Sequence, residues 1–131
     1  MDKLVQTSQI NLYGCDVYKI SSKEIIQNFL EDLVACIDMT KIPSEMIGQS
    51  NPMVFNFNSG SVNRSSFEDG ITGTILLYES HCAIHIWPSK EYDLFATIII
   101  SSCKEYNTRK AYDFCKKYFL ADEASYGVLR N

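Results

Sequence analysis

Two short apolar runs on either side of Tyr78-Glu79-Ser80 constrain the fold of this 131-residue chain more than any other feature. The run before the junction is Ile71-Thr72-Gly73-Thr74-Ile75-Leu76-Leu77, and the run after it places Cys82, Ile84 and Ile86 at every second position. Apolar residues that recur with a period of two predict half-buried strands. Strands joined by so short a connection pair antiparallel. The sequence therefore predicts a hairpin whose turn lies near Glu79 and Ser80.

The same segment is unusually rich in reactive side chains. Glu79, Ser80, His81 and His85 all fall within the predicted hairpin. Charged and imidazole groups are costly to desolvate in a sheet. A cluster of them at this point therefore indicates a functional site.

The rest of the chain predicts further strands and two helices. Strands are predicted at residues 9–15, 53–57, 71–78, 81–87 and 94–102, with a short edge strand at 126–129. Ser21 and Glu24 form a predicted capping box for a helix whose apolar residues recur at helical spacing from Ile25 to Ile37. Asn107 or Thr108 is predicted to cap a second helix. Residues 39–50 and 58–69 are predicted loops.

Two helices cannot cover both faces of a sheet of four to six strands. The predicted fold is therefore α+β: a two-layer sandwich with a mainly antiparallel sheet and both helices on one face. The other face of the sheet is then exposed to solvent or buried by a partner. The length predicts one domain, residues 1–131.

Composition narrows the classes of function. The formal net charge is −4 and no basic run is present, which argues against nucleic acid as a partner. No stretch has the length of a membrane-spanning helix and no signal-peptide pattern opens the sequence, so we expect no membrane association and a cytoplasmic location. The five cysteines are odd in number and form no CxxC pair, which predicts neither a disulfide framework nor a metal site.

A serine at a tight junction after Glu79 can break its own chain. If the Ser80 hydroxyl attacks the Glu79 carbonyl, the acyl group moves from nitrogen to oxygen, and elimination of the resulting ester cuts the backbone. The step requires a base for the Cα proton and a donor for the oxyanion. His85 is a candidate base because histidine is the residue type most often used as a general base near neutral pH. Thr72, on the preceding strand, offers a hydroxyl at the same site if the strands pair.

Two motifs resemble the autoprocessing site of bacterial-type S-adenosylmethionine decarboxylases. Gly70-Ile71-Thr72-Gly73 is similar to the family's Gly-x-Ser-Gly segment, and residues 79–88 are similar to its Glu-Ser-His-x-x-Ile-His-x-Trp/Tyr-Pro block. Residues 12–16 are similar to its opening strand and turn, and Cys103 followed by Lys110-Ala111 to its cysteine and downstream Lys-Ala. The resemblance covers most of the chain, and the 79–88 block is its specific part.

The resemblance implies a catalytic cycle and roles for named residues. The chain would be cut between Glu79 and Ser80 into a β chain (1–79) and an α chain (80–131), and Ser80 would become a pyruvoyl group. Thr72 and His85 would assist this processing. The pyruvoyl ketone would form a Schiff base with S-adenosylmethionine and accept the electrons released as CO₂ leaves. The product would be the aminopropyl donor of spermidine synthesis, made by a homodimer.

The resemblance also implies which groups handle the substrate. Cys103 would protonate the substrate carbon, and Phe67 would stack on adenine. About three extra residues precede Cys103, so Ser101 or Ser102 is an alternative for the proton donor.

Departures from the family pattern leave other functions open. Ile86, Ser89 and Lys104 stand where the family has Thr, Glu and Gly, and the strand before Cys103 lacks the family's Asp. One alternative keeps the pyruvoyl chemistry but acts on a basic amino acid such as arginine or ornithine. A second alternative is an uncleaved, catalytically inactive relative that acts as a binding or regulatory subunit. A third, a lyase without a pyruvoyl group, leaves the Glu-Ser-His block unexplained.

Overall fold

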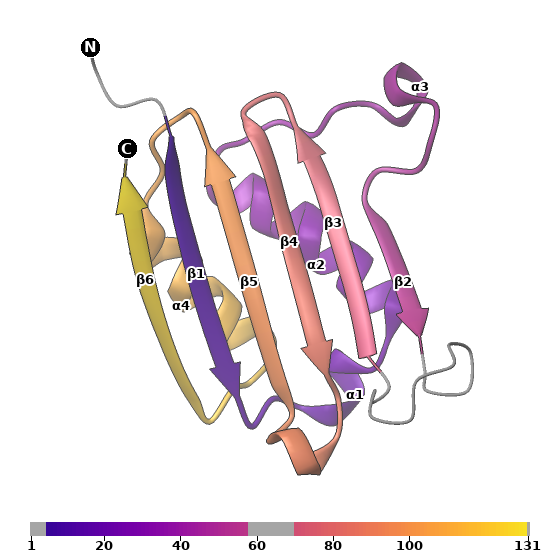
Figure 1. Ribbon diagram of the computed structural model, residues 1–131, viewed down its shortest axis with the longest axis vertical. Coiled ribbons are helices and arrows are strands. Elements are labelled where there is room, and N and C mark those ends of the chain that lie inside the picture. The colour runs from indigo at the N-terminus through magenta and orange to yellow at the C-terminus, as the bar shows by residue number, and fades with distance from the viewer. Residues whose placement is uncertain (1–4, 58–69, 131) are drawn as a thin grey trace.

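Six strands form one sheet in the order β2-β3-β4-β5-β1-β6, and every neighbouring pair is antiparallel (Figure 1). The computed structural model describes residues 5–57 and 70–130. The strands are β1 (Gln6–Tyr13), β2 (Met53–Phe57), β3 (Gly70–Leu77), β4 (Ser80–Trp87), β5 (Phe95–Ser102) and β6 (Glu123–Arg130). The helices are α1 (Val17–Ile20), α2 (Lys23–Cys36), α3 (Ser44–Ile47) and α4 (Thr108–Tyr118), with a 3₁₀ turn η1 (Lys90–Tyr92).

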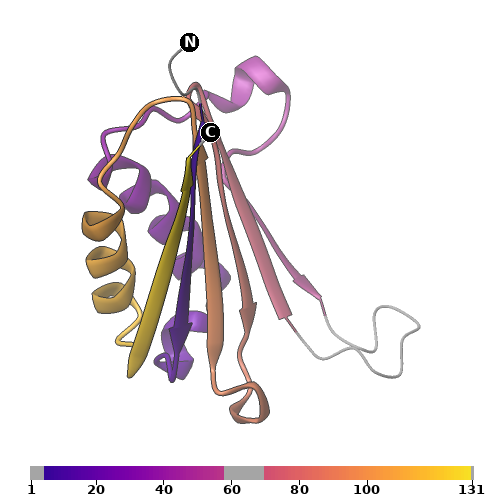
Figure 2. The ribbon, with the colours of Figure 1, turned by 60° about the vertical axis from the view of Figure 1, so that its left-hand side comes forward.

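The two long helices, α2 and α4, lie on the same face of the sheet (Figure 2). This arrangement confirms the predicted α+β sandwich. The short α1 connects β1 to α2, and α3 lies beyond the end of the sheet rather than over it (Figures 1 and 2). No helix within residues 5–57 and 70–130 is long and apolar enough to cross a membrane.

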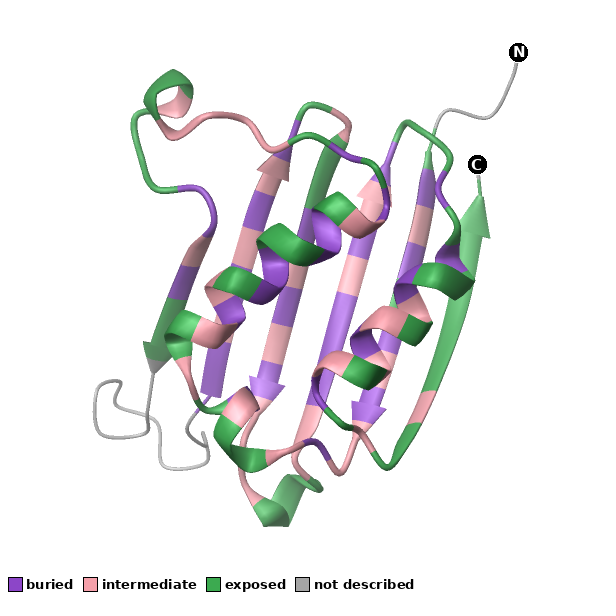
Figure 3. Cartoon of the chain, turned by 180° about the vertical axis from the view of Figure 1, so that it is seen from behind, coloured by how far each residue is buried: buried purple, intermediate pink, exposed green. Residues whose placement is uncertain are grey.

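The buried residues gather on the central strands and on the sides of α2 and α4 that face them (Figure 3). Every second residue of β1, β3, β4 and β5 is buried on this side, as the period-two pattern predicts. Phe29, Leu30 and Leu33 of α2 and Cys115 of α4 pack against them with no exposed surface. The unbroken Ile98-Ile99-Ile100 run lies on β5, which is paired on both sides by β4 and β1.

Four local predictions differ from the structure. The first strand spans Gln6–Tyr13 and not residues 9–15. Ser22 rather than Ser21 caps α2, because its hydroxyl accepts the Ile25 amide at 3.2 Å, whereas Ser21 ends α1. Glu24 is therefore in the first turn but does not complete a capping box. The predicted loop at residues 39–50 contains α3, and the edge strand β6 spans eight residues because it pairs with all of β1. Asn107 caps α4 by accepting the Lys110 amide at 3.0 Å, as predicted.

The sheet brings distant parts of the sequence to one end. β3 ends, β4 begins and β5 ends at the edge drawn uppermost in Figure 1. The register aligns residues across this end of the sheet: Ser80 lies opposite Leu77 and Ser102, and Ser102 lies opposite Gln6. The Glu79–Ser80 bond is therefore next to the end of β5 and the turn that follows it.

Candidate active site

The Glu79–Ser80 bond lies where the two-residue turn of the β3–β4 hairpin meets β4. The predicted pairing across this turn is confirmed, since Leu77 and Ser80 are opposite each other. Ser80 has a φ of 148°. This value falls in a region that residues other than glycine rarely occupy, and such strain costs on the order of 1–3 kcal/mol. The bond is thus held in a conformation of raised energy.

Two backbone amides hold Glu79, one at its carbonyl and one at its carboxylate. The amide of Cys103, in the turn after β5, donates to the Glu79 carbonyl oxygen at 2.9 Å. The amide of Thr40 donates to the Glu79 carboxylate at 3.0 Å, and the Thr40 carbonyl accepts the Tyr78 amide at 3.1 Å. A donor aimed at a carbonyl oxygen is the arrangement that stabilises an oxyanion when that carbonyl is attacked.

The Ser80 hydroxyl is exposed and lies 3.2 Å from Nδ1 of His81. Within this chain its hydrogen-bonding neighbour is therefore the adjacent histidine. Ser80 is at the start of β4, and its hydroxyl and the carbonyl that it would attack belong to consecutive residues. The Ser80 hydroxyl and the Glu79 carbonyl carbon are therefore kept near each other by the covalent chain.

Thr72 and His85 form a second polar pair in the middle of the sheet. They face each other across β3 and β4, and the Thr72 hydroxyl lies 3.2 Å from Nδ1 of His85. Their side chains lie on the face of the sheet that no helix within residues 5–57 and 70–130 covers, because their neighbours Ile71, Ile84 and Ile86 point to the core. The structure thus brings these two predicted processing residues together.

The structure does not bring Thr72 and His85 close to Ser80 of the same chain. His85 lies five positions after Ser80. Five residues of strand span about 17 Å at about 3.3 Å per residue. A contact between the His85 imidazole and the Ser80 hydroxyl of the same chain would require β4 to be broken.

Cys103 is the exposed one of three candidates for the proton donor. Its side chain reaches solvent, and its backbone is next to the Glu79 carbonyl. The Ser102 hydroxyl is buried and is occupied locally, since it donates to the Lys104 carbonyl at 2.8 Å and accepts the Lys104 amide at 2.9 Å. The Ser101 hydroxyl lies 3.3 Å from that of Thr7. Of the three groups, the Cys103 thiol is free of such contacts among the described residues.

A small hollow adjoins Cys103 at this end of the sheet. Gln6, Ser102, Lys104 and Arg130 contribute to its wall. Gln6 is almost fully buried and accepts the Arg130 Nε–H at 3.3 Å while it donates to the Tyr106 carbonyl. Glu105 lines the same hollow, so Cys103 has a concave neighbourhood with charges of both signs.

The remaining cysteines are shielded from reaction to different degrees. Burial raises the pKa of Cys15 and of Cys82 to about 12, and it raises the pKa of Cys115 well above its ordinary value. Cys36 is half-buried, and desolvation raises its pKa as well. A raised pKa lowers the thiolate fraction and so the reactivity.

Phe67, the predicted adenine-stacking residue, lies outside the described residues. Within residues 5–57 and 70–130, no group of three or more His, Cys, Asp or Glu side chains is arranged to hold a metal ion.

Sequence reasoning missed the contribution of the segment after α2. Thr40 holds both the Glu79 carboxylate and the Tyr78 amide, although it is far from them in sequence and belongs to a predicted loop. No local pattern in the sequence distinguishes Thr40, because its contacts are made through the backbone. Only the packing of the chain places this segment beside the hairpin.

The fold and the site define a class of protein: an α+β sandwich in which a strained Glu-Ser junction closes a hairpin beside a cysteine-bearing turn. The family described as S-adenosylmethionine decarboxylase matches residues 6–131. The chain belongs to the S-adenosylmethionine decarboxylase family.

Named relatives and a solved structure agree with this assignment. An S-adenosylmethionine decarboxylase proenzyme of Picrophilus torridus is 32% identical over 116 residues, which are 88% of this chain and 75% of the relative. Another, from Archaeoglobus fulgidus, is 27% identical over 118 residues, 90% of this chain and 88% of the relative. The crystal structure of the adenosylmethionine decarboxylase from Aquifex aeolicus is similar with a TM-score of 0.67 and 26% identity, over 98% of this chain and 91% of that one.

Proposed function

We propose that this chain cuts itself between Glu79 and Ser80 and then decarboxylates S-adenosylmethionine. The observation that carries the proposal is the geometry of this bond: a serine at φ 148° follows a carbonyl whose oxygen accepts the Cys103 amide at 2.9 Å. Family membership supports the same reading, because its relatives are named decarboxylase proenzymes. The reading as an uncleaved, inactive relative leaves this geometry without a purpose.

The cut proceeds by steps that the named groups can support. The Ser80 oxygen attacks the Glu79 carbonyl carbon, the oxyanion is held by the Cys103 amide, and the carbon–nitrogen bond breaks to leave an ester. A base then removes the Ser80 Cα proton, and the Cβ–oxygen bond breaks with the Glu79 carboxylate as leaving group. Hydrolysis of the resulting dehydroalanine releases ammonia and leaves a pyruvoyl terminus. The products are a β chain of residues 1–79 and an α chain of residues 80–131.

Ser80 and Cys103 have places that suit the later reaction. When formed, the pyruvoyl group supplies an electron sink for the bond between the substrate α-carbon and its carboxylate. The Cys103 thiol, exposed beside the cut, is the proposed donor of the proton to that carbon. The hollow beside Cys103 is lined by Arg130 and by Glu105, so it offers both a cationic and an anionic group to a polar ligand. Phe67 keeps its proposed role against adenine.

We further propose a homodimer in which His85 and Thr72 of one copy serve Ser80 of the other. Within one chain they are separated from Ser80 by about 17 Å of strand at the usual rise. The uncovered face of the sheet carries an aromatic cluster beside its polar residues. In this cluster the Phe95 ring centroid lies 5.1 Å from that of Tyr13 and 5.5 Å from that of Trp87. Two such sheets stacked face to face are about 10 Å apart, so side chains from both reach the space between them.

The mass of the denatured protein tests self-cleavage. We expect two fragments, residues 1–79 and 80–131, with the second lighter by one ammonia than a serine terminus. The Ser80→Ala chain has no hydroxyl and is the control, which we expect to stay whole. A wild-type chain that stays whole after long incubation would overturn the proposal.

The substrate is tested separately on the cleaved protein. Release of CO₂ from carboxyl-labelled S-adenosylmethionine, arginine and ornithine is compared at equal concentrations. We expect release from S-adenosylmethionine alone. Release from arginine or ornithine alone would keep the pyruvoyl chemistry and replace the substrate.

A further inference from the structure

Lys104 connects the two segments that hold Glu79. Its ammonium nitrogen donates to the Asp38 carbonyl oxygen at 2.6 Å. Lys104 follows Cys103, whose amide holds the Glu79 carbonyl, and Asp38 is two residues before Thr40, whose amide holds the Glu79 carboxylate. These contacts close a ring around Glu79, which we call the Glu79 ring: Glu79, Cys103, Lys104, Asp38 and Thr40.

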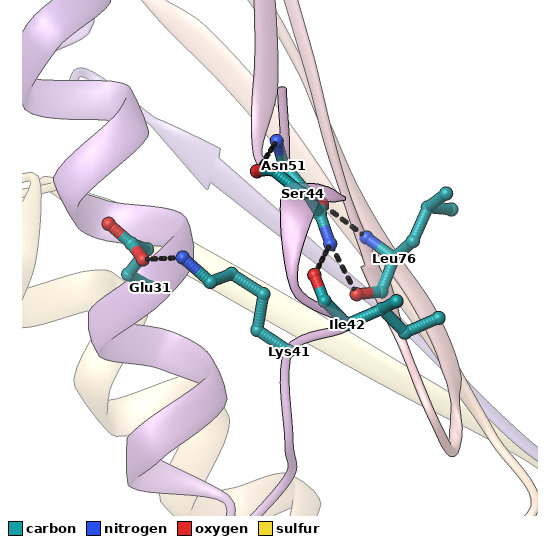
Figure 4. Close-up of polar contacts among 6 residues, drawn as sticks. All are labelled: Glu31, Lys41, Ile42, Ser44, Asn51 and Leu76. Carbon is teal, nitrogen blue, oxygen red and sulfur yellow. Dashed lines mark hydrogen bonds and ion pairs between the residues drawn. The ribbon is translucent and has the colours of Figure 1, made fainter. Parts of the chain in front are cut away.

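Each side of the Glu79 ring is fixed from outside it. On the Lys104 side, the buried Ser102 hydroxyl binds both the amide and the carbonyl of Lys104. On the Thr40 side, the Asn51 side chain donates to the carbonyls of Ile42 and Leu76 at 2.8 Å and accepts the Leu76 amide at 2.8 Å (Figure 4). Both sides are thus held by other contacts, and the Lys104 side chain joins them independently of Glu79.

We propose that Lys104 is a positioning residue for self-cleavage. This proposal rests on the proposed function and names a residue for it that the family pattern does not supply, since glycine is expected at this position. The spacing between the two segments determines how the Cys103 amide meets the Glu79 carbonyl. If the segments separate, the amide moves away from the oxygen on which negative charge develops, and the attack by Ser80 slows.

Three variants separate positioning from general stability. Lys104→Met keeps the side-chain length and removes the donor, whereas Lys104→Arg keeps a charged donor. Lys41→Met is the matched control: the Lys41 ammonium also makes a 2.6 Å contact, to Glu31, and Lys41 is next to Thr40, but it does not belong to the Glu79 ring (Figure 4).

The first readout is the rate of cleavage of freshly synthesised chains, followed by gel. We expect Lys104→Met to cleave about three- to tenfold more slowly, which is the range for one exposed charge-assisted hydrogen bond. Lys104→Arg is expected to stay within about twofold of the wild type because it keeps the donor. Lys41→Met is expected to do the same because it loses only an exposed ion pair that does not belong to the Glu79 ring.

The second readout is amide hydrogen exchange in the uncut Ser80→Ala background. Adding Lys104→Met is expected to speed exchange at Thr40 and Cys103 by about the same factor, while adding Lys41→Met leaves both amides unchanged. This readout does not depend on cleavage. A variant that is merely less stable would speed exchange throughout the core and would not be rescued by arginine.

The outcomes distinguish this proposal from the proposed function. Cleavage of wild type and Lys104→Met at equal rates would overturn the role of Lys104 alone, as would an equal slowing by Lys41→Met. Exchange at Thr40 and Cys103 that is indifferent to Lys104 would overturn the Glu79 ring. A wild-type chain that stays whole would overturn self-cleavage, and the role of Lys104 in it, whatever the exchange data show.

Discussion

Ser80 has one property that can be read from the sequence, its hydroxyl after Glu79, and one that cannot, its backbone conformation. Its hydroxyl and its place after Glu79 are visible in the motif, and they predict the chemistry. Its φ of 148° is not visible, because serine has no preference for that region. The strain arises from the way the hairpin turn and the end of β5 hold both sides of the residue.

We predict that strain at Ser80 can be measured with two uncut variants. Ser80→Ala and Ser80→Gly both lack the nucleophile, but glycine occupies a positive φ without a steric penalty. The Gly variant should therefore be more stable than the Ala variant by about 1 kcal/mol, even though glycine in a strand costs conformational entropy. Urea unfolding of the two purified chains checks this. An Ala variant of equal or greater stability would mean that the backbone relaxes without Ser80.

The two proposed reactions use different atoms of Cys103, and this allows them to be separated. The backbone amide holds the Glu79 carbonyl, and the thiol is the proposed proton donor. We predict that Cys103→Ala still cleaves, because the amide remains, but loses about 100-fold or more in CO₂ release, the usual contribution of a general acid. Fragment masses and CO₂ release on one preparation check both parts. Ser102→Ala is the comparison, and a Cys103→Ala enzyme with full activity would reassign the proton donor.

At the scale of elements, the sequence predicted the helices and strands that follow from the local spacing of apolar residues. The β3–β4 hairpin, the central place of β5 and the two long helices follow from the spacing of apolar residues, and the structure confirms them. The cap of α2 was misplaced because Ser21 and Ser22 are adjacent and both suit a cap. The extent of β6 was underestimated because pairing with β1, not its own sequence, determines its length.

Gly73 shows how closely α2 packs on the sheet. A Cβ atom at this position would lie 3.2 Å from Leu30 of α2, 3.2 Å from Val54 of β2 and 3.3 Å from Ile84 of β4. We therefore predict that Gly73→Ala destabilises the fold by about 1–2 kcal/mol, the usual cost of overfilling a packed core.

Thermal unfolding of the uncut Ser80→Ala chain, with and without Gly73→Ala, checks this value. Gly127→Ala is the matched control, because a Cβ atom there meets nothing within 4 Å. If both substitutions have the same effect, the cost reflects glycine in a strand and not the packing of α2.

At the scale of the whole molecule, the uncovered face of the sheet is the feature that one chain leaves unexplained. A row of side chains in register crosses all six strands there: Phe55, Thr72, His85, Thr97, Asn11 and Ser125. Within this row Thr72 binds His85, and the Thr97 hydroxyl donates to Asn11 at 2.8 Å. The sequence predicted an open face with a partner as one possibility. It did not predict that His85 and Ser80 are far apart within a chain, because strand spacing is fixed only once the register is known.

The proposed exchange of residues between copies can be tested by mixing two inactive chains. A Ser80→Ala chain lacks the nucleophile but retains His85, and a His85→Ala chain lacks the base but retains Ser80. If His85 serves the other copy, co-expression should make one complete site per mixed dimer, and the His85→Ala chains should be cut there. In random dimers about half of all pairs are mixed, so up to about half of the total His85→Ala chain should be cleaved, assuming equal expression and cleavage only across a dimer. Differently tagged chains and a gel give this fraction directly. If His85 acts within its own chain, neither chain is cut alone or together, and the dimer would then need a different reason to form.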